Sequence, residues 1–194
     1  MSEIKTALML CQTIFNFQFN EHDIYNNLEI KTPIKNIFIF NGRNKIFKYC
    51  LSFEIEINGR IIKPKLFRTG KMSIPGLKSL EEHQTINNII IDLLKDIIPN
   101  IQINHSRIIS GRFFYNCNFK VDLNKLDREF KDYPKKYNPE RFSGLIINFP
   151  KTTAYIFNSG KINIATNQIH ELQSIKDIIV KDIIDSIVLT YKKI

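Results

Sequence analysis

Two segments of the sequence place a phenylalanine among lysine, tyrosine and hydroxyl side chains, just before a glycine. The first segment is KLFRTGKM (65–72), and YIFNSGKI (155–162) repeats its pattern. Alternate residues of an extended strand lie on the same face. The residues that share such a face are Lys65, Phe67 and Thr69 in the first segment and Tyr155, Phe157 and Ser159 in the second. A face that is partly aromatic and partly polar suits binding in a hydrated groove.

No group of residues has the types and spacing that catalysis or metal binding requires. The four histidines, His22, His83, His105 and His170, are isolated, with no cysteine or carboxylate at ligand spacing. The sequence has no glycine-rich phosphate loop and no GxSxG or HExxH motif. A solvated helix face explains the acidic residues between 122 and 132. We therefore expect a protein that is not an enzyme and that needs neither a metal nor a cofactor.

The composition is basic, with a formal net charge of +9 and a pI near 9.4. This balance favours a polyanionic partner such as nucleic acid or an anionic membrane surface, although simple solubility explains it equally well. No stretch approaches the roughly 18 apolar residues of a membrane span, so we expect no membrane partner. The 3 cysteines (Cys11, Cys50 and Cys117) form no CxxC pair. They favour a soluble protein in a reducing, intracellular compartment.

The chain contains one structural unit twice, which predicts a duplicated fold. Upstream of the Gly-Lys segments, FNFQFNEHDIYNNL (15–28) parallels CNFKVDLNKLDREF (117–130). Each of these is a strand that ends in a polar cap and a short helix. We predict two repeats, residues 1–100 and 101–194, that form a single body without a flexible linker. Two independent α+β domains are the alternative.

Hydrophobic periodicity predicts the remaining elements of each repeat. Apolar residues at helical spacing predict one long helix over about 81–98 and a second over about 169–191. Strict alternation predicts a strand over 47–57, and the Asn-Gly step at 58–59 predicts a hairpin turn. The segment at 141–149 is the corresponding strand of the second repeat. Each unit therefore reads as strand, short helix, several antiparallel strands, long helix.

The second repeat contains motifs that resemble a known family. YNPERFSGLI (137–146) and KTTAYIFNSGKINIAT (151–166) are similar to the second repeat of the TATA-box-binding proteins (TBP). That family has a Tyr-x-Pro-Glu-x-Phe-x-Gly-Leu-Ile strand, then an Ile-Phe-x-Ser-Gly-Lys-hydrophobic strand pair. In the first repeat PKLFRTGKMSIPGLKS (64–79) resembles the equivalent segment less closely. The resemblance spans the chain, with low identity outside these motifs.

The resemblance implies an α+β, TBP-like saddle in which two pseudo-symmetric repeats form one curved antiparallel sheet. The long helices lie on its convex face, and the concave face lies on the DNA minor groove. Each repeat wedges two phenylalanines between base steps, at a cost of a few kcal/mol per step, and the family kinks duplex DNA by about 80°. By position, the wedging residues are Phe47, Phe67, Phe142 and Phe157. Phe47 shares an apolar face with Tyr49 and Leu51, so core packing explains it equally well.

The resemblance also implies contacts with the DNA backbone and with a protein. In the family, the lysine after the turn glycine and the hydroxyl residue two positions before it reach phosphates. The corresponding residues are Thr69, Lys71, Ser159 and Lys161, with Arg141 as an addition. Such lysine contacts are independent of base sequence and sensitive to salt. Glu140 matches a family glutamate that contacts transcription factor IIB. The family's first long helix is basic, whereas this one is acidic, so we do not expect the usual partners of that helix.

Several groove-facing positions depart from the family, which has Asn and Val on the first strand of each repeat. The predicted groove-facing residues here are Leu10, Gln12, Lys65, Ser73, Pro75, Arg112, Phe114, Tyr155, Asn163 and Ala165. The minor groove mainly distinguishes A·T from G·C pairs. Polar groups and an arginine in place of small apolar surface therefore predict an AT-rich preference that is broader than the TATA box.

Together these features predict a divergent, TBP-like transcription initiation factor that binds and bends double-stranded DNA through the minor groove. Its expected protein partners are a transcription factor IIB-like protein and the RNA polymerase machinery. The alternative is a TBP-fold interaction subunit that has lost DNA binding. Ile and Asn are abundant in the sequence, a bias typical of an AT-rich genome. This bias and the divergence point to a large DNA virus or a fast-evolving protist. The expected location is therefore the nucleus, or a cytoplasmic viral factory if the protein is viral.

Overall fold

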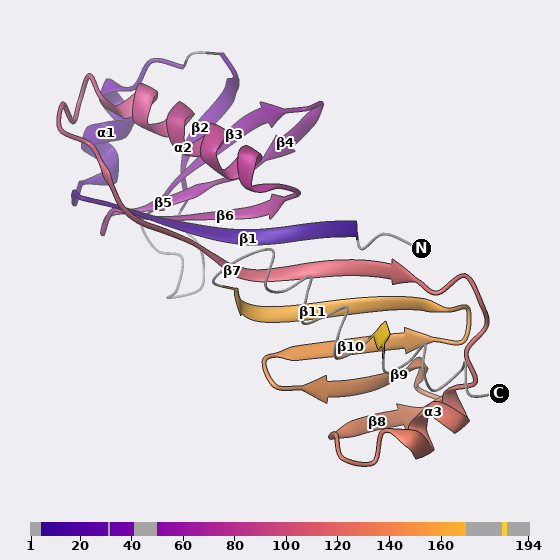
Figure 1. Cartoon of the computed structure of the whole chain (residues 1–194). Helices are drawn as coiled ribbons and strands as arrows, with labels where there is room; N and C mark the ends of the chain where they lie inside the picture. The colour runs from indigo at the N-terminus through magenta and orange to yellow at the C-terminus, as the bar shows by residue number, and fades with distance from the viewer. Residues whose placement is uncertain (1–4, 31, 41–49, 170–183, 186–194) are drawn as a thin grey trace. The chain divides into compact units, whose positions relative to one another are not determined.

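The structure is a computed structural model that describes residues 5–30, 32–40, 50–169 and 184–185. The chain divides into two compact units (Figure 1). The N-terminal unit is Met9–Ile108, and the C-terminal unit is Ile109–Ile194 together with Met1–Leu8. Each unit is built on antiparallel strands. The predicted repeat boundary after residue 100 stays a prediction.

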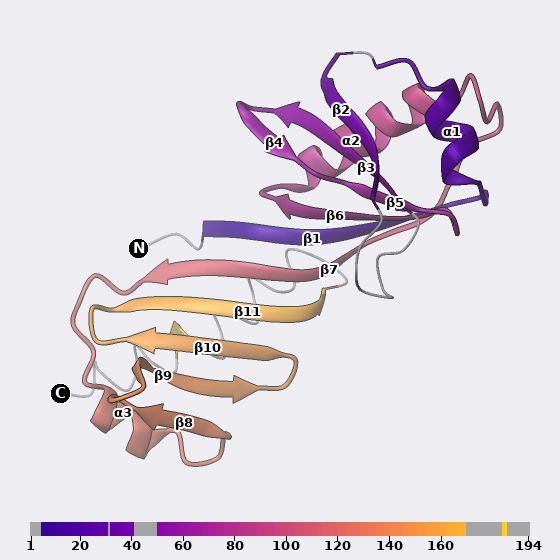
Figure 2. The same cartoon turned by 180° about the vertical axis from the view of Figure 1, so that it is seen from behind.

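The N-terminal unit has a sheet with the strand order β2-β3-β5-β6-β1, and β4 pairs with β3 at the side of this path. Its elements are β1 (Lys5–Phe15), α1 (Glu21–Asn27), β2 (Ile34–Phe40), β3 (Cys50–Ile57), β4 (Arg60–Ile62), β5 (Lys65–Phe67), β6 (Lys71–Leu77) and α2 (Leu80–Leu94). The predicted hairpin at 58–59 is confirmed, because Asn58 and Gly59 both have positive φ and join β3 to β4. Figures 1 and 2 show α2 lying across one face of this sheet.

The core of the N-terminal unit lies between α2 and the sheet. Strand residues such as Phe53 and Leu66 are fully buried, as are Ile86 and Ile90 of the helix. The alternation of buried and less buried residues along β5 and β6 leaves the opposite face of these strands more open. The pattern follows from the two-residue period of a strand, which sends neighbouring side chains to opposite faces.

Helix α2 is shorter than the sequence predicts. It ends at Leu94 instead of Ile98, and the backbone N–H groups of Ile97 and Ile98 both donate to the carbonyl of Leu94. The residue before a proline is disfavoured in the helical conformation, and Pro99 follows directly. The apolar periodicity therefore continues beyond the helix into turns that lead toward β7 (Ile103–Asn116).

The C-terminal unit repeats the same plan, with the strand order β7-β11-β10-β9-β8. Its elements are β7 (Ile103–Asn116), α3 (Leu123–Glu129), β8 (Lys135–Asn138), β9 (Phe142–Phe149), β10 (Thr152–Phe157) and β11 (Lys161–Ile169). Phe113, Leu145, Ile147 and Ile156 form part of its core and are fully buried. The long helix predicted over about 169–191 lies almost entirely outside the described residues.

Among the described residues, no helix is both long and apolar enough to cross a bilayer. The cysteines are free thiols, and two of them lie in the core of the N-terminal unit. Burial raises the pKa of the Cys11 thiol to about 12. It also raises the pKa of Cys50 and of Cys117. Thiolate chemistry is therefore suppressed at all three positions.

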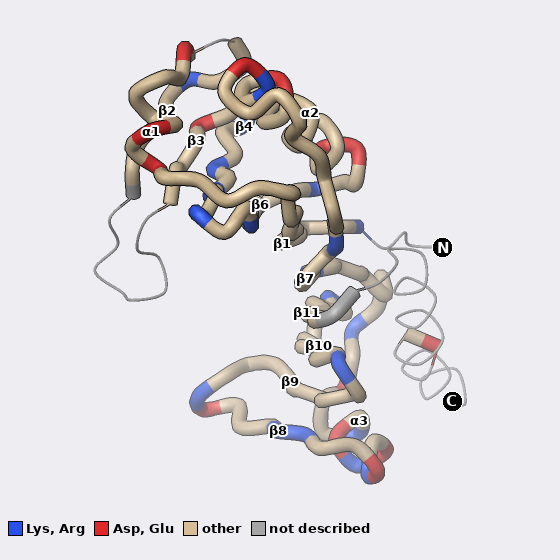
Figure 3. Tube along the Cα trace, turned by 90° about the vertical axis from the view of Figure 1, so that its left-hand side faces the viewer, with Lys and Arg blue, Asp and Glu red and all other residues tan. Residues whose placement is uncertain are grey.

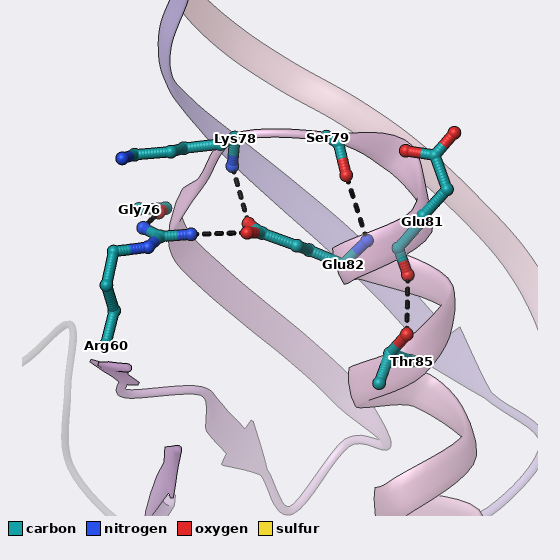
Figure 4. Close-up of polar contacts among 7 residues, drawn as sticks. All are labelled: Arg60, Gly76, Lys78, Ser79, Glu81, Glu82 and Thr85. Atoms are coloured by element: carbon teal, nitrogen blue, oxygen red, sulfur yellow. Dashed lines mark hydrogen bonds and ion pairs between the residues drawn. The ribbon is translucent and has the colours of Figure 1, made fainter. Parts of the chain in front are cut away.

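An ion pair anchors the first turn of α2 to the sheet of the N-terminal unit (Figure 4). Arg60 of β4 donates to the Glu82 carboxylate and also, at 3.0 Å, to the carbonyl of Gly76. The second Glu82 oxygen accepts from the Lys78 backbone N–H at 2.7 Å, and Ser79 caps the helix through its hydroxyl. Burial alone would raise the pKa of Glu82, but these hydrogen bonds outweigh it and hold the pKa below its usual range.

We predict that Glu82→Gln lowers the free energy of unfolding by about 2 kcal/mol at neutral pH, because it breaks a largely buried, charge-assisted contact. A lowered folded-state pKa means that this contribution is present at neutral pH and is lost as the pH falls through the folded-state value. On acidification below about pH 4.5, the free energy of unfolding of the variant should therefore fall less than that of the parent. Urea titrations between neutral and acidic pH measure this. Asp92→Asn, on the exposed face of the same helix, is the control and should cost little.

Candidate nucleic-acid interface

The face of the C-terminal unit opposite its core carries the predicted groove residues of the second repeat. Tyr155 of β10 pairs with Asn163 of β11, and Thr153 pairs with Ala165. These side chains are half-buried, whereas the residues between them, such as Ile156, are in the core. The alternation that the sequence predicts for β10 is therefore present in the structure.

Three aromatic rings meet on this face. The ring centroids of Phe142 and Phe157 are 5.7 Å apart, and those of Phe142 and Tyr155 are 6.2 Å apart, both in edge-to-face geometry. Gly144, which pairs with Phe157, lies beneath the rings. A Cβ at this position would lie 2.7 Å from Cε1 of Phe142 and 3.1 Å from Cε1 of Phe157. The rings approach each other because the strand carries no side chain at Gly144.

The rings line a hollow of about 340 Å³ in the C-terminal unit. The residues that line it are Arg112, Phe114, Phe142, Tyr155, Phe157, Asn163, Ile164 and Ala165. All of the predicted groove-facing and wedging residues of the second repeat are thus brought together. Phe114 and Phe142 are the most exposed of its rings, at 47% and 38%.

A second hollow, of about 660 Å³, contains residues that sequence reasoning missed. It is lined by Lys5, Phe114, Tyr115, Asn116, Asn118, Lys161 and Asn163. Asn116 follows Arg112 and Phe114 at strand spacing, so extending that alternation finds it. No local sequence pattern identifies Lys5 as a lining residue, because its neighbours are set by the pairing of strands that are far apart in the sequence.

The N-terminal unit brings its predicted residues into two lines across the sheet. Gln12 of β1 pairs with Ser73 of β6, which also pairs with Lys65 of β5, and Leu10 pairs with Pro75. Pro75 is exposed and the others, except Gln12, are half-buried.

The side chain of Gln12 is more buried than the sequence predicts for a groove-facing residue. It is only 7% exposed, and its side-chain carbonyl accepts a hydrogen bond from Arg107 at 3.2 Å. Arg107 comes from a distant part of the chain, so local alternation does not reveal this contact.

The predicted wedge residue Phe67 of the N-terminal unit has a different neighbour from its counterpart Phe157 in the C-terminal unit. Phe67 is half-buried and pairs with Cys50, which is fully buried. Cys50 therefore stands where the C-terminal unit has Gly144, so the N-terminal unit has a side chain at the position that the rings of Phe142 and Phe157 approach in the other unit. Phe47, the other predicted wedge, lies outside the described residues.

The chain is similar to proteins named for binding the TATA box. The family model described as "Transcription factor TFIID (or TATA-binding protein, TBP)" matches residues 112–184. TATA-box-binding proteins of Pyrobaculum neutrophilum and Pyrobaculum aerophilum are 32% and 34% identical over 115 residues, which cover 53% of this chain. The solved structure of Methanococcus jannaschii TBP aligns with a TM-score of 0.73 and 24% identity, covering 97% of this chain and 99% of that one. The chain is thus similar in sequence to TATA-box-binding proteins over part of its length and shares the fold of one of them.

The structural likeness confirms the predicted fold, an α+β fold of the TBP type. The sequence matches are narrower: they cover 55% and 54% of the two Pyrobaculum proteins, so the chain spans about half the length of the curated relatives it matches. The family match lies in the second half of the chain, as does the closer motif resemblance. The more divergent half is the one that has Cys50 in place of the glycine.

Each unit of this TBP-like fold contains the same turn before its exposed lysine. Gly70 and Gly160 have φ of 75° and 83°, and their N–H groups donate to the carbonyls of Phe67 and Phe157 respectively. Their own carbonyls accept from the N–H groups of Phe15 and Cys117, which ties each turn to the end of the first strand of its unit. The predicted phosphate-binding residues Thr69, Lys71, Ser159 and Lys161 are exposed beside these turns.

The remaining predicted residues lie in the turn between β8 and β9. Arg141 and Glu140 are both exposed, and the Arg141 backbone N–H donates to the carbonyl of Asn138. Neither residue lines the two hollows of the C-terminal unit.

Polar side chains inside the N-terminal unit form a hydrogen-bonded cluster around His83. His83 of α2 lies 3.0 Å from the Thr13 hydroxyl, which donates to Asn87 at 2.8 Å, and Ser106 lies 3.3 Å from the same imidazole nitrogen. Burial lowers the pKa of His83, so the ring is neutral near pH 7. Within the residues that the structure describes, no group of three or more His, Cys, Asp or Glu could hold a metal ion.

We predict that Gly70→Ala destabilises the chain by about 3 kcal/mol or more, since the new Cβ would lie 2.2 Å from the Phe17 carbonyl oxygen. Gly59→Ala is the matched control. Gly59 has a similar φ of 70°, but no heavy atom lies within 4 Å of the position that its Cβ would take, so only backbone strain of about 1 kcal/mol should remain. Urea unfolding followed by circular dichroism measures both. Equal losses would contradict the close approach of this turn to the backbone that follows β1.

Proposed function

We propose that this chain is a transcription initiation factor that binds double-stranded DNA in the minor groove and bends it by wedging phenylalanine rings between base steps. The observation that carries the proposal is the cluster of Phe142 and Phe157 over Gly144 on an open sheet face. The likeness to proteins named as TATA-box-binding proteins supports the same interpretation.

The ring geometry suits a wedge. A ring that replaces the stacking lost between two base pairs must be rigid, apolar and exposed, since unstacking costs a few kcal/mol per step. Phe142 is exposed, and its edge-to-face contacts with Phe157 and Tyr155 hold it in place. In the first repeat, Phe67 and Phe47 are the proposed wedges. Cys50 opposite Phe67 makes that wedge different from the pair over Gly144.

Charge provides the affinity that does not depend on sequence. Lys71 and Lys161 are exposed directly after the turn glycines, with Thr69 and Ser159 before them, and Arg141 is exposed in another turn. We assign these residues to DNA phosphates. Each phosphate neutralised on duplex DNA should contribute about 0.9 to the slope of log K against log salt.

The side chains around the wedges determine which sequences are accepted. Arg112 and Asn163 line the same hollow as Phe142 and Phe157, while Ser73, Lys65 and Pro75 occupy the corresponding face of the N-terminal unit. Arginine in the minor groove favours the narrow grooves of AT-rich DNA. We therefore propose an AT-rich preference that is broader than the TATA box.

The proposed protein partners follow from the family and from one exposed residue. Glu140 is exposed in the turn after β8, where a transcription factor IIB-like protein could reach it. Figure 3 shows the acidic positions of α2 in red. The exposed acidic residues of the helix are Glu81 and Asp92, and the helix contains no Lys or Arg, so a partner on α2 would need a basic surface. The RNA polymerase machinery is the proposed assembly, in the nucleus or in a cytoplasmic viral factory.

The first test measures binding and bending of an AT-rich duplex, with gel shifts at two salt concentrations and energy transfer between dyes at the duplex ends. We expect tight binding with a steep salt dependence, and we expect Phe142→Ala and Phe157→Ala each to reduce affinity about tenfold or more and to reduce the bend. Tyr25→Ala removes an equally exposed ring from α1 and should change neither. No duplex binding at low salt would overturn the proposal and favour an interaction subunit of the same fold.

The second test is selection of bound duplexes from a random pool. We expect AT-rich sequences that are broader than TATAAA, because polar side chains and Arg112 stand where the family has small apolar and amide groups. Arg112→Asn, which restores the family residue type, should narrow the selected set. Recovery of a GC-rich major-groove motif would contradict the minor-groove proposal.

A further inference from the structure

The C-terminal unit carries more exposed aromatic surface than the proposed duplex wedge uses. Phe142 and Phe157 serve as wedges, but Phe114 and Tyr155 lie on the same face and line the same hollow. Phe114, at 47% exposed, is more open to solvent than the wedge residue Phe142, at 38%. Large rings at the surface of a folded unit point to a ligand that covers them.

The ring-lined hollow has the size and chemistry of a site for a planar group. Its volume of about 340 Å³ lies at the lower end of the range for small-ligand sites, about 300–1,000 Å³. Phe114, Phe142, Tyr155 and Phe157 provide faces and edges for stacking. Arg112 and Asn163 provide hydrogen-bonding groups at its wall. A nucleobase combines the flat face and the polar edge that these side chains match.

The adjoining hollow has the chemistry of a phosphate site. Its described lining residues include Lys5, Lys161 and three asparagines, and none of these described residues is acidic. Neither lysine makes an ion pair with another residue in the described part of the chain. Phe114 and Asn163 line both hollows, so the aromatic and the cationic sites are continuous.

This combination favours a single strand over a duplex. In a duplex the base faces are stacked on their neighbours except at a wedged step, so the rings that do not wedge, Phe114 and Tyr155, would meet mainly base edges. In a single strand every base has an accessible face, and proteins bind such strands with aromatic platforms beside a cationic track. We propose that the C-terminal unit also binds single-stranded nucleic acid, with an unpaired base against Phe114 and Tyr155 and its phosphate against Lys5 and Lys161.

The test uses the full chain and fluorescence anisotropy with two labelled probes of about 12 nucleotides. One probe is oligothymidylate, and the other is an abasic strand of the same length and charge. We expect the chain to bind oligothymidylate about tenfold more tightly than the abasic strand, because only the former can stack. Equal affinity for the two probes would overturn the proposal.

Variants locate the site. Phe114→Leu and Tyr155→Leu keep apolar volume but remove the ring, so each should weaken oligothymidylate binding roughly fivefold or more and leave the abasic strand unchanged. Lys5→Ala should weaken the binding of both probes and reduce the slope of log K against log salt by about 0.7. Tyr25→Leu, on α1 of the N-terminal unit, is the matched control and should change neither probe. Thermal unfolding checks that each variant is folded, and a folded Phe114→Leu variant with unchanged oligothymidylate binding would contradict the site.

The same anisotropy series with an AT-rich duplex separates this inference from the proposed function. Duplex binding without a difference between the two single-stranded probes overturns only the single-strand site. Base-dependent binding of the single strand without duplex binding supports this site and overturns the proposed minor-groove function. The inference therefore does not depend on duplex bending.

Discussion

The aromatic face of the C-terminal unit depends on the absence of one side chain. Rings on neighbouring strands of a sheet stand roughly side by side, and they approach each other closely only where the residue between them leaves space. Gly144 provides that space beneath Phe142 and Phe157, because a methyl group there would lie within 2.7 Å of one ring and 3.1 Å of the other. The cost is the conformational freedom of a glycine in a strand, which the packed rings offset.

A second constraint places the exposed lysine of each unit at the end of a pair of strands. Gly70 and Gly160 adopt positive φ, and each closes a turn whose carbonyl accepts a hydrogen bond from the end of the first strand of its unit. A Cβ at these glycines would lie 2.2 Å and 2.1 Å from the backbone oxygens of Phe17 and Phe119. The lysine that follows each glycine is therefore held at the end of the strand pair. The ring faces and the cationic ends are positioned by backbone packing rather than by the lysines themselves.

These features differ in how far the sequence reveals them. The turns, the hairpin at 58–59 and the open faces of β5 and β10 follow from glycine placement and from two-residue alternation, which are local properties. Gln12 shows the limit of such reasoning, since Arg107 covers it from a position 95 residues away. The pairing of Cys50 with Phe67 is also hidden from local reasoning, because it joins two strands that are not consecutive in the chain. In addition, the break between the short strands β4 and β5 at Lys63 and Pro64 obscures the alignment of the first repeat with the second.

The differences between the repeats bear on how a duplicated protein can act asymmetrically. Two identical halves would present the same groups to both ends of a bound site and could not distinguish its two orientations. Here one half carries a ring cluster over a glycine, with Arg112 beside it, whereas the other carries Cys50 in the glycine position and a glutamine held by an arginine. Wedging and groove contacts would then differ in strength between the two ends. For the proposed DNA-bending function, this asymmetry gives a physical basis for a preferred direction on the duplex.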